Sequence, residues 1–61
     1  MRIDRGHMVF IAKVLHGMKP HLSEEHFELI TEEFVRELNA IKPGFKPDLF
    51  RDHVVNGRAP Y

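Results

Sequence analysis

Five histidines in a chain of 61 residues are the first side chains whose chemistry needs an explanation, because neutral imidazole is a common metal ligand. They are His7, His16, His21, His26 and His53. No two of them stand four residues apart, the spacing that brings a pair of imidazoles to one face of a helix. The chain also has no cysteine to complete a zinc site. We therefore expect solvated or helix-capping histidines, and we predict no metal and no other cofactor.

Hydroxyl nucleophiles are scarce, since Ser23 is the one serine and Thr31 the one threonine. Nucleophilic catalysis needs such a group beside a positioned base. Ser23 is followed by two glutamates and a helical apolar pattern, which is typical of a helix N-cap. The glutamates follow one helix face, where Glu32 and Arg36 have the spacing of an ion pair. We predict no catalytic residue and a chain that is not an enzyme.

The first element that would position these side chains is a helix over residues 8–18. Its apolar residues recur with the three- and four-residue steps of one helical face, at Ile11, Val14, Leu15 and Met18. Val9 and Phe10 fall outside that stripe. Residues 1–7 show no periodicity and are predicted to be a polar lead-in outside the core.

A second helix is expected to begin after Ser23, and its apolar stripe consists of Phe27, Ile30, Phe34, Leu38 and Ile41. Leu29 does not belong to this stripe. At about 100° per residue it projects nearly opposite Phe34, among charged side chains. It is therefore either an isolated exposed leucine or the centre of a contact.

Residues 42–45, Lys-Pro-Gly-Phe, fit a turn in which glycine supplies a positive φ. Pro47 then suits the first turn of a third helix, and Asn56 followed by Gly57 suits its end. Residues 58–61 form a short tail. The sequence thus predicts an all-α, three-helix domain over residues 8–57, with a core of Ile11, Val14, Leu15, Phe27, Ile30, Phe34, Leu38, Phe45, Phe50 and Val54.

Charge is unevenly distributed, although the formal net charge is zero. Residues 22–41 contain six glutamates and one arginine, whereas lysine and arginine predominate on both sides of this segment. The longest apolar stretch, residues 8–18, is shorter than the roughly 20 residues of a membrane span and is not followed by a cleavage signal. Together with the lack of cysteine, this favours a cytoplasmic protein without membrane contact.

The chain also resembles a loose set of short proteins from actinobacterial phages and prophages. The residues that carry the resemblance are a helix with Phe34, Val35 and Leu38, the turn of residues 42–45, and Asp48-Leu49-Phe50. In that set a helix precedes an Asn-Pro-x-Phe turn and a final helix with Arg-Phe, whereas this chain has Lys42 and Leu49 at the asparagine and arginine positions. The resemblance implies a phage origin and, because small phage proteins often bind host proteins, a protein-binding role.

A core of this size does not include all the apolar side chains of the chain. The remaining ones could form a contact surface, which predicts a protein-interaction module. The candidate contact residues are Val9, Phe10, Leu29 and Tyr61, rimmed by Glu25, Glu32, Glu33 and Arg36. The partner is either another protein, such as a host protein, or a second copy of the chain, in which case Val9 and Phe10 complete the core of a homodimer.

Three short helices also admit a helix-turn-helix that binds nucleic acid, and this is the alternative function. The charges count against it, because the glutamates of the second helix would repel phosphate. The third helix has only Arg51, with Asp48 and Asp52 beside it. A basic rim of Arg2, Arg5, Lys13 and Lys19 is what favours the alternative.

Overall fold

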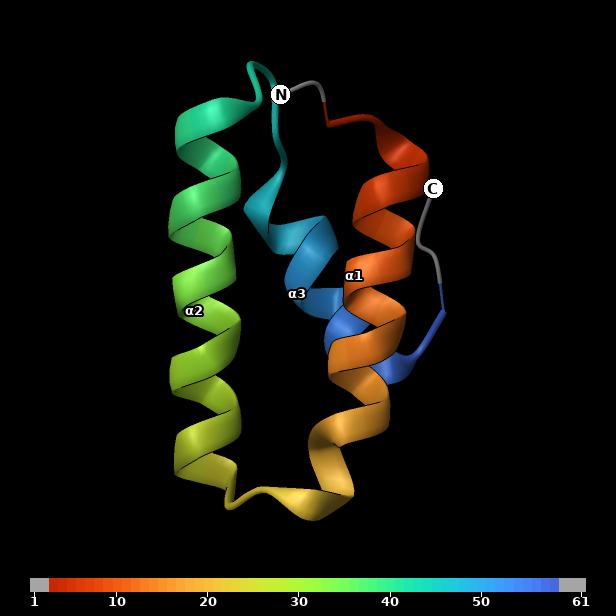
Figure 1. The fold of residues 1–61 in the computed structure, drawn as a ribbon, viewed down its shortest axis with the longest axis vertical. Helices are drawn as coiled ribbons and strands as arrows, with labels where there is room; N and C mark the ends of the chain where they lie inside the picture. The colour runs from red at the N-terminus through yellow and green to blue at the C-terminus, as the bar shows by residue number, and fades with distance from the viewer. Residues whose placement is uncertain (1–2, 59–61) are drawn as a thin grey trace.

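The computed structural model describes residues 3–58. Its elements are α1 (Arg5–Met18), a short 3-10 helix η1 (Lys19–His21), α2 (Glu24–Ile41) and α3 (Pro47–Asn56). α1 and α2 run antiparallel beside each other, and α3 packs against both of them (Figure 1). No strand occurs within residues 3–58, which confirms the prediction of a small all-α, three-helix domain.

The N-terminus of α1 lies three residues before the predicted start at Met8. Asp4 forms a capping box with His7: its side chain accepts from the His7 backbone N–H at 3.1 Å, and its own N–H donates to Nδ1 of His7 at 3.1 Å. Residues 5–7 of the predicted lead-in are therefore helical, and Ile3 packs against the core, contrary to the prediction. Residues 4–7 are exposed, as expected for a segment outside the core. The motif escapes sequence inspection because histidine stands where a capping box usually has glutamate or glutamine.

Local signals set the other helix ends as expected. The Ser23 Oγ accepts from the His26 N–H at 3.1 Å at the start of α2. Pro47 opens α3, and Gly57 ends it in the left-handed conformation with φ of 76°. Gly44 has φ of 79° in the turn between α2 and α3, where the Phe45 N–H donates to the Lys42 carbonyl at 3.2 Å. Each of these signals acts within one turn of the chain, so it is readable from sequence.

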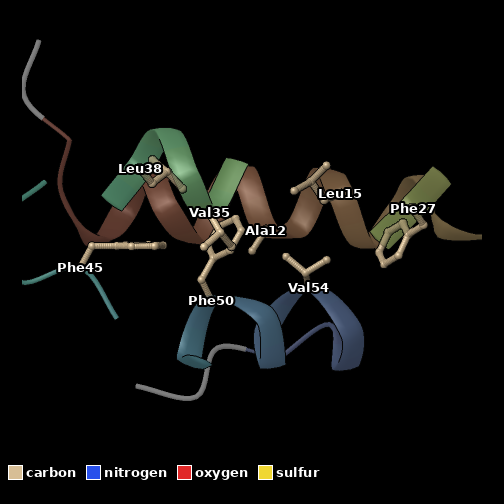
Figure 2. Close-up of a cluster of buried hydrophobic side chains, with 8 residues drawn as sticks. All are labelled: Ala12, Leu15, Phe27, Val35, Leu38, Phe45, Phe50 and Val54. Carbon is tan, nitrogen blue, oxygen red and sulfur yellow. The ribbon is translucent and has the colours of Figure 1, made fainter. Parts of the chain in front are cut away.

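The core lies where α3 meets α1 and α2, and Figure 2 shows Phe50 and Val54 directed from α3 toward the other two helices. Its buried apolar residues are Ala12, Leu15, Phe27, Val35, Leu38, Phe45, Phe50 and Val54. Ile11 and Ile30 are half-buried against this core.

Two predicted core residues are wrong, because Val14 is 46% and Phe34 is 38% exposed. Ala12 and Val35 take their places. The inward faces of α1 and α2 are turned toward α3, so that a small residue on α1 faces α3 and Phe34 moves to the edge of the core. The buried Thr31 lies on this inward face of α2, where its hydroxyl donates to the Phe27 carbonyl at 2.8 Å.

Candidate functional site

The predicted contact residues that the structure describes do not form one surface. Phe10 on α1 and Leu29 on α2 are exposed, at 66% and 63%, while Val9 is half-buried. Leu29 points outward from α2, since it stands about 180° around the helix from the buried Leu38. Tyr61 lies outside the described residues.

Three of the four charged residues predicted to rim the contact surface, Glu32, Glu33 and Arg36, form ion pairs. Glu32 accepts two bonds from Arg51 of α3, at 2.7 and 2.8 Å, instead of pairing with Arg36 as its spacing suggested. These hydrogen bonds lower the pKa of Glu32 and raise the pKa of Arg51. Arg36 donates to Glu33 at 2.5 Å, within α2. Glu25 is exposed in the first turn of α2. Among these charged residues, Glu32 is the one that links α2 to α3, through its two bonds from Arg51.

Two polar contacts mark the sides of α1 and α2 that face α3. On α1 the Nδ1 of His16 lies 2.9 Å from the Val54 carbonyl of α3. On α2 the marker is Glu32, through its bonds to Arg51. Residues on the opposite sides of these two helices therefore point away from α3.

The surface on those opposite sides is apolar. Val14 and Met18 each stand two positions from His16, which places them about 160° around α1 from the α3 contact. On α2, Phe34 and Ile41 stand about 160° and 180° around the helix from Glu32. Figure 1 shows that α1 and α2 run antiparallel, and α3 packs against both helices. The helical angles therefore direct these side chains away from α3 on both helices.

We call this surface the open face, and define it by its exposed large apolar residues, which are Phe10 (66%), Val14 (46%), Met18 (38%), Phe34 (38%) and Ile41 (51%). Of this set, only Phe10 is among the contact residues predicted from sequence. Val14 and Phe34 are predicted in the core, and Met18 and Ile41 in the same inward stripes. On each helix the open face adjoins the true core, since Met18 is a helical neighbour of Leu15 and Phe34 of Leu38, so apolar periodicity alone does not separate them.

Charged residues of opposite sign flank the open face on its two helices. Lys13 is exposed on α1, three positions after Phe10. Glu33 and Glu37 are exposed on α2, and Glu37 lies three positions after Phe34 and four before Ile41. The residues of the open face therefore have a basic flank on α1 and an acidic flank on α2.

A second candidate site is a basic hollow of about 250 Å³ near the start of α1 and α3. Arg5, Lys42 and Lys46 surround it, and Met8 and Leu49 contribute apolar surface. The Nζ of Lys42 donates to the Ile3 carbonyl at 3.0 Å, so this lysine also holds the N-terminal segment. Lys42 and Lys46 lie in the connection between α2 and α3, whereas Arg5 comes from the start of α1, so only the fold brings all three cations together.

The histidines are dispersed over the fold. His7 belongs to the capping box, His16 reaches the last turn of α3, and His53 is buried at 3% exposure, so the expectation of a solvated or capping role is wrong for His53. His53 is buried because it lies between Phe50 and Val54 on the inward face of α3. Among the residues that the structure describes, no group of three potential ligands is placed to hold a metal ion.

None of the helices within residues 3–58 combines the length and the apolar content of a membrane span. Comparison with known proteins adds no further assignment: no family model, no curated protein and no solved structure matches this chain.

Proposed function

We propose that this chain is a small protein-interaction module and that the open face is its binding surface. One observation carries the proposal: five large apolar side chains are 38–66% exposed on the sides of α1 and α2 that point away from α3, in a domain whose described core contains eight buried apolar residues. The binding surface thus differs from the predicted one, with which it shares only Phe10.

The apolar side chains of the open face remain in contact with water in the single chain. Fully burying a large apolar side chain is worth about 1.5–3 kcal/mol, and that gain is largely unrealised at Phe10 and Ile41. Monomeric proteins rarely expose large contiguous apolar patches, and such patches usually mark interaction sites. A protein surface that covers the open face would realise this gain.

The flanking charges support a protein partner over nucleic acid. Glu33 and Glu37 beside the open face would repel a phosphate backbone. Arg51, the basic residue of α3, is bonded to Glu32 and to Asp48 and is therefore engaged within the domain. Mixed charges around an apolar centre are typical of protein interfaces, where they fix orientation. The resemblance to phage proteins makes a host protein one candidate partner.

Site-specific photo-crosslinking in cells that produce the chain tests this proposal. A photoreactive amino acid replaces Phe10 in one variant and Leu29 in the other, two positions of nearly equal exposure, 66% and 63%, on different surfaces. We expect covalent protein adducts from position 10 and far weaker ones from position 29. Equal adducts from both positions, or none from position 10, would contradict the proposal.

A further inference from the structure

We infer that the partner of the open face is a second copy of this chain, in a two-fold dimer where α1 of each copy lies against α2 of the other. This inference rests on the proposed function, since it names the partner for the same surface. Three properties of the chain select a second copy: its size, its net charge and the distribution of charge between α1 and α2.

Size favours a partner that is always present. Domains of about 60 residues bury only about 60% of the surface of the unfolded chain and are marginally stable, so that a disulfide, a metal or an oligomer adds a large share of their stability. This chain has no cysteine, and the described residues contain no cluster for a metal ion. A second copy supplies additional buried surface whenever the chain itself is present, whereas a different protein does so only when it is co-produced.

Net charge permits this association. The chain has nine basic and nine acidic residues, so its formal net charge is zero. Two copies therefore approach without the long-range repulsion that keeps strongly charged proteins apart.

The arrangement of the two copies follows from the charges of the two helices. α1 contains Arg5 and Lys13 and no acidic residue, whereas α2 contains six glutamates and Arg36. A two-fold axis parallel to α1 and α2 places Lys13 of one copy beside Glu33 and Glu37 of the other. An axis across the helices would stack α2 on α2 and bring the glutamates of both copies together. Because like charges across an interface are unfavourable, the parallel axis is selected.

The first experiment measures the apolar part of this interface by sedimentation equilibrium from micromolar to millimolar concentration. We expect wild-type protein to reach twice the chain mass. Phe10→Gln should weaken the dimer about a hundredfold, because the contact contains two copies of this side chain. Leu29→Gln is the matched control, since its exposure of 63% is close to the 66% of Phe10, and it should leave the dimer unchanged.

The second experiment tests the orientation. Lys13→Glu should raise the dissociation constant of the dimer about tenfold. Each ion pair at the rim of the interface is weak, but this substitution makes both Lys13 contacts of the two-fold dimer repulsive. The double variant Glu33→Lys with Glu37→Lys should also dissociate. An equimolar mixture of the two proteins should restore association, since each new glutamate then faces lysines of the other chain. Circular dichroism at the same concentrations reports the fold of each variant.

The outcomes separate this inference from the proposed function. A wild-type chain that stays monomeric at all concentrations overturns the second copy as partner, while adducts from position 10 to a different protein still support the open face as a binding surface. A dimer that Leu29→Gln dissociates and Phe10→Gln does not overturns both. A dimer sensitive to Phe10→Gln but not restored in the mixture overturns the proposed orientation.

Discussion

The imidazole of His16 lies directly over Gly57, so that a β-carbon at position 57 would come within 2.7 Å of Nε2. The same ring places Nδ1 2.9 Å from the Val54 carbonyl. Thus a side chain of α1 contacts the C-terminal end of α3 where that end turns into the left-handed conformation, with φ of 76° at Gly57. This contact fixes the position of α3 relative to α1.

The first prediction follows from this contact. Gly57→Ala should destabilise the fold by about 2 kcal/mol or more, because alanine is disfavoured at positive φ by roughly 1–2 kcal/mol and its methyl group would also displace His16. Gly44→Ala is the matched control, since Gly44 has φ of 79° but a β-carbon there would meet no atom within 4 Å. Urea unfolding of both variants should show the larger loss at position 57. Equal losses would mean that the His16 contact has no energetic effect.

The second prediction concerns the capping box that starts α1. Asp4→Ala should destabilise the protein by about 0.5–2 kcal/mol, the usual effect of losing an N-cap side chain. Amide hydrogen exchange should accelerate at His7 and Met8, whose N–H groups bond to the Asp4 side chain and carbonyl, respectively. Ser23→Ala provides a comparison at the N-cap of α2. Unchanged exchange at His7 after Asp4→Ala would contradict the observed start of α1.

The third prediction is a pH dependence from the bond between Glu32 and Arg51. Because this bond lowers the pKa of Glu32 in the folded state, its contribution is present above the unfolded pKa and is lost as pH falls through the folded pKa. Both side chains are largely exposed, at 49% and 41%, so the effect should stay below about 1 kcal/mol. Denaturant titrations between neutral and acidic pH should show that Glu32→Gln reduces this acid sensitivity.

The control for that measurement is Glu33→Gln, because the Glu33 carboxylate accepts from Arg36 of the same helix and does not join α2 to α3. At concentrations where the chain is monomeric, we expect it to change the acid sensitivity less than Glu32→Gln does. An identical change in both variants would show that the contact between α2 and α3 adds nothing to the pH dependence.

The fourth prediction distinguishes the observed core from the predicted one. Ala12 is fully buried where α1 packs against α3, so Ala12→Leu should overpack this contact and destabilise the fold by about 1–3 kcal/mol or more. Val14→Leu adds one methylene at a position that is 46% exposed, and it should have little effect on unfolding at concentrations where the chain is monomeric. If Val14→Leu lowered the free energy of unfolding more than Ala12→Leu does, Val14 would belong to the core and not to the open face.

The sequence by itself determined the fold class and most helix ends, because these depend on interactions within one or two turns. Ser23, Pro47 and Gly57 act through neighbouring backbone groups, and each is identified correctly from sequence. The capping box of Asp4 and His7 is equally local, but its histidine is an unusual member of that motif. Six of the ten predicted core residues are buried for the same reason, since helical periodicity limits which side a helix can bury.

Only the tertiary structure decided which of two apolar stripes is buried on α1 and on α2. Ala12 and Val14 lie about 160° apart around α1, and Val35 and Phe34 lie about 100° apart around α2. The packing of α3 selects the first of each pair for the core. The open face consists of the residues left on the other side. Contacts between segments far apart in the chain, such as His16 with Val54 and Glu32 with Arg51, set the position of α3, and no local pattern encodes them.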